Sequence, residues 1–181
     1  NNDVNNDLFA LVCSPNLPTR LKTMRFNKRH YMLSTLEIVD WGVLFWPPLS
    51  KSTMIVIFRK PNGGRVLDRI KSRDISLSGY EVPLKIVRPF VSILLQLQDE
   101  GLSHRSIRAN NMFFKDESFS EVVIGENVTA PPGFDQESIY EPIERAMCNP
   151  EGRGIGSVAD DIYALGTTIG ILMVGHNPLS N

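Results

Sequence analysis

The sequence predicts an α+β fold with a small β-rich N-terminal part and a mainly helical C-terminal part. Runs rich in Val, Ile, Phe and Trp lie in the N-terminal part. Apolar residues at helical spacing follow over residues 83–100, and residues 157–174 are apolar nearly all round. Strands followed mostly by helices are typical of a two-part α+β architecture. We therefore expect the parts to span residues 1–62 and 63–181.

Length, charge and cysteine content narrow the class of protein. The 181 residues suffice for one domain with a buried core. The net charge of -1 argues against a dedicated nucleic-acid binder. Cys13 and Cys148 are too few for a disulfide framework, so we expect a reducing, cytoplasmic setting. The longest apolar run, within residues 162–174, is shorter than the roughly 18 residues of a membrane span, so none is expected.

The N-terminal part is predicted to hold three strands and one helix. Residues 8–13 form a short apolar run that suits a buried strand. Residues 19–33 have apolar positions at helical spacing, with Thr19 as the expected cap. This helix is basic, with Arg20, Lys22, Arg25, Lys28 and Arg29. Its charged face is interpreted as a solvated surface or, alternatively, as a docking surface for an acidic partner.

Two further strands are predicted before the chain enters the helical part. They span residues 36–46 and 53–59, with a proline-containing turn between them. Trp41 and Trp46 are expected to pack in the core or at its edge. Residues 60–64 contain Pro and Gly, which predict a turn that leads into the second part.

The C-terminal part is predicted to be mostly helical. In the helix over residues 83–100, Pro89 indicates a kink or the true start, and Gly101 the end. Ser157, with an acid three residues on, is the expected cap of a central helix. The other predicted elements are a short helix at 65–71, a strand at Val122–Ile124 and a helical turn at 141–147. The glycine-rich residues 152–156 are interpreted as a flexible linker, since their spacing is not that of a nucleotide-binding loop.

A dense polar loop over residues 101–111 separates the helix at 83–100 from the strand at Val122–Ile124. Polar loops held by a rigid scaffold often carry functional sites. Within this loop, the run His104-Arg105-Ser106-Ile107-Arg108 is followed by Asn111. Further along the chain comes the run Asp161-Ile162-Tyr163-Ala164-Leu165-Gly166.

Together and in this order, the two motifs resemble the H-R-D-L-K-x-x-N catalytic loop and the D-V-W-S-L-G run of eukaryotic-type protein kinases. The resemblance implies a minimal protein-kinase-like fold that lacks the glycine-rich loop and the last helices. Residues 140–144 resemble the A-P-E end of the activation segment, with Glu144 as its acid. The resemblance implies structural roles for His104, Glu144, Asp161 and Gly166. Asp161 is expected to accept hydrogen bonds from the backbone of residues 104–106, because a buried carboxylate needs such partners.

The same resemblance shows which groups for phosphoryl transfer are replaced. Ser106 stands where the family has its catalytic aspartate, and Arg108 where it has lysine. A hydroxyl is a poor proton acceptor near neutral pH. Val12 or Cys13 stands where the ATP-binding lysine is needed, and the basic helix has no acid to pair with it. The sequence therefore predicts no catalytic residue and no kinase activity.

Two functions are compatible with these motifs. The first is a catalytically inactive, pseudokinase-like domain that needs no cofactor and binds proteins as a scaffold or regulator. The alternative is a diverged phosphotransferase or nucleotide-binding protein for ATP and Mg²⁺. Asn111 and Glu126, the latter at the D-F-G position, would then bind metal and cofactor through oxygen, with Arg108 at the phosphates. An enzyme needs a cation facing Asn111, whereas a scaffold predicts an occluded or apolar cleft.

A protein partner or self-association is expected, through the basic helix, residues 125–136, or faces that missing helices would leave exposed. In the family, the arginine at the Arg105 position receives an activating phosphate. The resemblance implies that Arg105 pairs here with an acid, or with phosphorylated Thr129, Ser138 or Tyr140.

Overall fold

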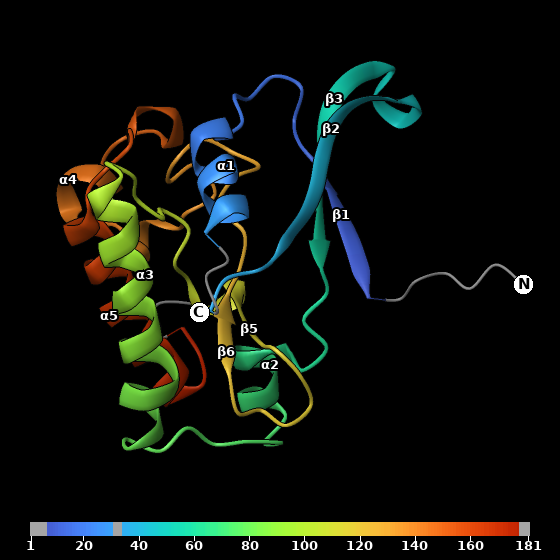
Figure 1. Cartoon of the computed structure of the whole chain (residues 1–181). Helices are drawn as coiled ribbons and strands as arrows, with labels where there is room; N and C mark the ends of the chain where they lie inside the picture. Colours follow the sequence, from blue (N-terminus) through green and yellow to red (C-terminus); the bar gives the residue numbers. More distant parts are fainter. Residues whose placement is uncertain (1–6, 31–33, 178–181) are drawn as a thin grey trace, which may run out of the picture.

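The computed structural model describes residues 7–30 and 34–177 and has the expected α+β architecture (Figure 1). A three-stranded sheet lies at one side of the molecule, the long helices lie at the other, and α1 and a second small sheet lie between them. The strands are β1 (Leu8–Val12), β2 (Ile38–Trp46), β3 (Lys51–Arg59), β4 (Gly64–Arg65), β5 (Met112–Phe114) and β6 (Val122–Ile124). The helices are α1 (Leu21–Arg29), α2 (Val66–Lys71), α3 (Arg88–Asp99), α4 (Ile143–Ala146) and α5 (Val158–Val174).

The first sheet is antiparallel, with β3 between β1 and β2. Val56 and Phe58 of β3 are fully buried together with Met24 of α1, so this helix shares the core of the N-terminal part. Trp41 packs against this core, as expected. Trp46, by contrast, is exposed at the tip of the β2–β3 hairpin with four apolar neighbours, Val43, Leu44, Phe45 and Leu49.

The second sheet joins the two parts of the chain. It is antiparallel in the order β4-β5-β6, and a parallel bridge from Thr35 to Ile124 links the segment before β2 to it. The predicted strand at Val122–Ile124 is thus present, whereas β4 and β5 were not expected. Both are too short for a periodic signal in the sequence.

The helices α3 and α5 pack side by side over the second core (Figure 1). Each buries one stripe of side chains at helical spacing, and each fully buried apolar side chain contributes about 1.5–3 kcal/mol. The buried residues are Phe90, Ile93, Leu94 and Leu97 on α3, and Ala164, Leu165, Ile171 and Leu172 on α5. The expectation that α5 is central was incomplete, because Ile162, Tyr163, Met173 and Val174 form an exposed apolar face.

The ends of α3 follow its prolines and glycine. Residues Pro83–Val87 form a π-helical segment, and the α-helix begins at Arg88. Pro89 has no N–H and its ring clashes with a carbonyl of the preceding turn, so it is tolerated where a regular helix starts. At the other end, Gly101 has a φ of +64°, and the N–H of Leu102 donates to the carbonyl of Leu97 over 2.7 Å. Both indications from the sequence are therefore met.

The start of α1 differs from the expectation. Thr19 does not cap it; Arg20 occupies the cap position without a side-chain capping bond. The N–H of Arg20 donates instead to the carbonyl of Val128 over 3.0 Å, so a tertiary contact sets the start of the helix. At the other end the helix stops at Arg29, and the predicted continuation over residues 31–33 lies outside the described residues. No helix in the described ranges is long and apolar enough to cross a membrane.

Candidate functional site

One carboxylate of α5, that of Asp161, binds the backbone of the polar loop. Asp161 accepts hydrogen bonds from the backbone N–H groups of His104 and Arg105, both over 2.7 Å, which are the bonds expected from the sequence. Burial raises the pKa of Asp161 to about 6, against the lowering effect of these two bonds. Arg105 itself has a φ of +58°, which is uncommon for a residue with a side chain. Asp161 therefore stabilises a loop conformation that the backbone does not prefer.

His104 is fully buried beneath the loop. Burial, with a smaller contribution from the cations of Arg20 and Arg108, lowers the pKa of His104 to about 3, although a hydrogen bond with the backbone of Gly125 acts in the opposite direction. The imidazole is therefore neutral at physiological pH. Its side chain fills space beneath the loop.

This buried imidazole predicts a pH dependence of stability. Because the folded pKa of His104, about 3, lies below its ordinary value of 6.5, its contribution is fully present above pH 6.5 and is lost as the pH falls toward 3. The raised pKa of Asp161 acts oppositely between pH 3.8 and about 6. We expect the stability difference between the wild type and His104→Phe to shrink by about 1.4 kcal/mol per pH unit below 6.5. Urea unfolding at several pH values measures it, and a difference independent of pH would contradict the assignment.

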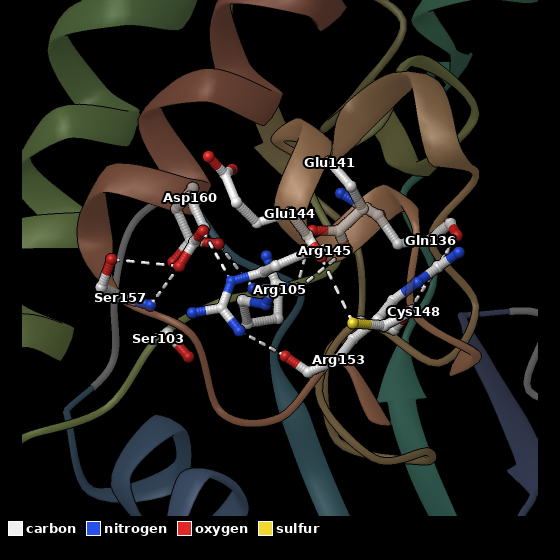
Figure 2. A network of polar contacts seen from close by, with 12 residues as sticks. Ser103, Arg105, Gln136, Glu141, Glu144, Arg145, Cys148, Arg153, Ser157 and Asp160 are labelled. Atoms are coloured by element: carbon white, nitrogen blue, oxygen red, sulfur yellow. Dashed lines mark hydrogen bonds and ion pairs between the residues drawn. The ribbon is translucent and has the colours of Figure 1, made fainter. Parts of the chain in front are cut away.

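Arg105 is paired inside the protein with Glu141 (Figure 2). The Nη2 of Arg105 lies 2.8 Å and 2.9 Å from the two carboxylate oxygens, and both side chains have 0% exposure. The acid that pairs with Arg105 is thus Glu141, which the sequence did not single out. Glu144, expected as the acid of the A-P-E-like segment, is exposed and has no side-chain polar contact within the described residues. Arg105 is one of two buried arginines here, since Arg153 Nη1 donates to the carbonyls of Gly133, over 3.0 Å, and Gln136.

Glycines make the enclosure of Arg105 possible. Gly133 and Gly156 have φ angles of +74° and +69°, and a Cβ on either would lie 2.8 Å or less from atoms of the Arg105 side chain. The segment 152–156, interpreted from the sequence as a flexible linker, therefore has a packing role at Gly156. Gly166, on the exposed side of α5, has no such neighbour, because a Cβ there would meet no atom within 4 Å.

A second ion pair fixes α4 to the start of α5 (Figure 2). The Nε of Arg145 donates to Asp160 Oδ1 over 2.7 Å, and its Nη1 donates to the carbonyl of Arg153 over 2.5 Å. The other carboxylate oxygen of Asp160 accepts from the N–H and the hydroxyl of Ser157, over 2.6 Å and 3.0 Å. The cap predicted at Ser157 is present, and its acid also ties the segment before α5 to the helix.

A cleft of about 640 Å³ lies above the loop, between β1 and the C-terminal part. It brings together Asn111, Arg108 and Glu126, as the motifs suggest, and adds the cations Lys60 and Arg65. The rest of the lining is Phe9, Leu11, Leu36, Pro61, Gly64, Asp68, Asn110 and Phe113. The cleft is neither occluded nor purely apolar, so the cleft expected of a scaffold is not what the structure has.

The two residues expected to hold a metal in this cleft are both hydrogen-bonded to the backbone. The Nδ2 of Asn111 donates to the carbonyls of Ser106, over 2.8 Å, and Glu126, over 3.0 Å. The amide oxygen of Asn111 packs over Gly125, where a Cβ would lie 1.8 Å from it. One carboxylate oxygen of Glu126 accepts from the backbone N–H groups of Val128 and Thr129, over 2.9 Å and 3.0 Å. The amide oxygen of Asn111 and the second carboxylate oxygen of Glu126 form no hydrogen bond with any residue that the structure describes. Across residues 7–30 and 34–177, no cluster of three or more His, Cys, Asp and Glu could hold a metal.

Where the resemblance places the proton acceptor and the phosphate-binding cation, the chain has Ser106 and either Val12 or Cys13, all uncharged. The Oγ of Ser106 accepts from Nη1 of Arg108 over 2.8 Å. Cys13, directly after β1, is buried, and burial together with the nearby Glu126 raises the pKa of its thiol to about 11. Cys13 is therefore a neutral thiol at physiological pH, and it supplies no positive charge for phosphates.

Sequence reasoning missed the function of Arg20. Assigned to the charged face of the basic helix, it instead reaches under the loop and donates to the carbonyls of Ser103, His104 (2.6 Å) and Asn127 (2.9 Å). Burial lowers the pKa of its guanidinium to about 10, so the group stays charged. In the sequence, Arg20 is one of five basic residues between positions 20 and 29, and no local pattern distinguishes it from the other four.

The fold is similar to that of a protein kinase structure. No family model matches the sequence. The crystal structure of Rad53 1-466 in complex with AMP-PNP superposes with a TM-score of 0.67 at 14% sequence identity and covers 89% of this chain. The chain corresponds to 39% of the length of that protein. At this identity the likeness concerns the fold alone, and it establishes that this chain has an α+β, protein-kinase-like fold.

Proposed function

We propose that this chain is a pseudokinase-like domain, which uses the kinase fold to bind proteins as a scaffold or regulator and does not transfer phosphate. The observation that carries the proposal is that the polar residues at the family's catalytic and metal positions each have a hydrogen-bond partner within the protein. Ser106 is bonded to Arg108, Asn111 to two backbone carbonyls, and Glu126 to two backbone N–H groups. A phosphoryl-transfer site instead needs groups that bind metal, phosphate and the substrate hydroxyl.

Replacement of the charged groups supports the same proposal. Phosphoryl transfer depends on positioning and on stabilising the charge that develops on the phosphate oxygens. By the resemblance, Ser106 stands in place of the aspartate that orients the nucleophile, and Val12 or the neutral Cys13 stands in place of the lysine at the phosphates. Lys60, Arg65 and Arg108 make the cleft cationic but supply no proton acceptor. With Ser106 in place of the aspartate, no carboxylate stands at the family's acceptor position to activate the hydroxyl of a substrate.

The test combines a phosphotransfer assay with thermal unfolding in ATP, with and without Mg²⁺. We expect no labelled product and no Mg²⁺-dependent rise in the melting temperature, because a ligand raises it only by binding the folded state. The variants Asn111→Ala and Glu126→Ala should respond to nucleotide as the wild type does. Transfer of phosphate, or a Mg²⁺-dependent shift that either variant abolishes, would instead establish the nucleotide-dependent alternative.

The setting of the domain is part of the proposal. Cys13 and Cys148 are free thiols, which suits the cytoplasm. The exposed apolar side chains of α5 and of the β2–β3 hairpin suit contact with a protein partner or a second copy of the chain. We propose neither a cofactor nor nucleic-acid binding, the latter because the net charge is -1.

A further inference from the structure

A groove of about 250 Å³ lies outside the cleft, between α1 and the end of α3. Its cationic residues are Lys22, Arg25 and Arg29, and its other lining residues are Phe26, His30, Glu100 and Leu102. The groove contains a single acid, Glu100, against three side chains that are charged at neutral pH. It therefore presents a local positive surface on a protein whose net charge is -1.

Two of these cations have no partner among residues 7–30 and 34–177. Lys22 Nζ donates to the carbonyl of Glu100 over 2.8 Å, and Lys28, on another side of α1, donates to the carbonyls of Ile38 and Val39. Arg25 and Arg29 are exposed, and neither forms a hydrogen bond or an ion pair with any residue that the structure describes. The helix also contains no acid. The two guanidinium groups are thus available to an external anion.

The arrangement of Arg25 and Arg29 has an energetic consequence. They are four residues apart, so they project from the same face of α1 as like charges, which destabilises a helix by a few tenths of a kcal/mol. An anion between them removes this repulsion. Guanidinium groups pair with carboxylates through two parallel hydrogen bonds, which adds orientation to charge attraction.

The base of the groove is apolar. Phe26 is 8% exposed and its ring lies 4.7 Å from that of His30, with the planes inclined by 33°. Leu102, from the loop after α3, is partly buried beside the same core. This surface accommodates an apolar side chain next to the cations. It favours a peptide with alternating acidic and apolar residues over a purely polar anion.

We infer that this groove is a docking site for a short acidic segment of a protein partner. Because α1 has nine residues, it is about 13 Å long, which matches about four residues of extended chain. A nucleic acid would need a longer basic surface and a basic excess. The inference deepens the proposed function and rests on it for the existence of a protein partner, but it does not depend on the state of the cleft.

Fluorescence anisotropy with a labelled peptide of sequence EDLEDL tests the site, and the peptide QNLQNL is the matched neutral probe. We expect EDLEDL to bind, and its affinity to fall as the salt concentration is raised. ATP and Mg²⁺ should leave this affinity unchanged. The double variant Arg25→Glu/Arg29→Glu should lose roughly tenfold or more in affinity, because it reverses both contacts. The control Lys51→Glu/Lys71→Glu makes the same change in net charge at exposed sites away from the groove and should bind as the wild type does.

Three outcomes would overturn the site: no binding of EDLEDL by the wild type, equal losses in the two double variants, or tighter binding of a single-stranded RNA hexamer at the same residues. Melting temperatures of both variants should equal that of the wild type, since all four side chains are exposed. A lower melting temperature in the Arg25/Arg29 variant alone would assign the arginines to folding. Phosphate transfer in the assay above would overturn the proposed function and leave peptide binding unaffected.

Discussion

Glu141→Ala should lower the free energy of unfolding by about 3–5 kcal/mol, because it leaves the guanidinium of Arg105 buried without its partner. Both side chains are fully enclosed and lie 2.8 Å apart at their closest atoms. The backbone at Gly133 and Gly156 packs closely against the Arg105 side chain, because a Cβ on either glycine would lie 2.8 Å or less from its atoms. Chemical denaturation of the wild type and the variant measures this loss of free energy.

The chain offers a matched control for this prediction. Glu144 lies three residues further on, is exposed, and should tolerate alanine within about 0.5 kcal/mol. The double variant Arg105→Met/Glu141→Leu should recover much of the loss, because apolar residues of similar size often replace a buried ion pair without penalty. If Glu141→Ala and Glu144→Ala changed the free energy of unfolding equally, the ion pair of Glu141 with Arg105 would not contribute to stability.

Arg20→Met should destabilise the domain by about 3 kcal/mol or more, since hydrogen bonds to a charged group contribute about 1.5–3 kcal/mol each. Three carbonyls of the loop and its neighbour, those of Ser103, His104 and Asn127, would lose their donor. We also expect faster hydrogen exchange at the amides of His104 and Arg105, which the same loop positions against Asp161.

The control for Arg20 lies on the same helix. Arg25→Met removes an exposed cation of α1 and should change stability by less than about 0.5 kcal/mol. It should nevertheless weaken binding of the acidic peptide. Arg20 would then contribute to stability and Arg25, five positions further on, to peptide binding. If Arg20→Met unfolds at the same denaturant concentration as Arg25→Met, the loop is held by other contacts.

The long helices were predictable because their signal is periodic. The apolar stripe of α3 and the capped start of α5 appear directly in the sequence, and the structure has both. The two motifs also predicted the hydrogen bonds from the loop to Asp161. Short elements such as β4 and β5 form only because other segments pair with them, so no local pattern marks them.

The roles of Glu141 and Arg20 could not be predicted from the sequence, because residues of equal charge cannot be distinguished along a chain. Glu141 and Glu144 are both acids near the same motif, and only packing decides that the first is buried. Arg20 and Arg25 likewise differ only in what the fold brings near them. The open cleft was also unpredictable, because its cations Lys60 and Arg65 come from a segment read as a turn and a short helix.

The pairing of Arg105 with Glu141 has a consequence for how such a domain can be controlled. A phosphate group on a protein is added and removed by other enzymes, whereas the carboxylate of Glu141 is part of the encoded sequence. Since the acid that neutralises Arg105 is present from synthesis, we expect the segment around Gly133 and Glu141 to take its shape as soon as the chain folds. Removal of a phosphate from this segment would therefore leave the charge of Arg105 neutralised.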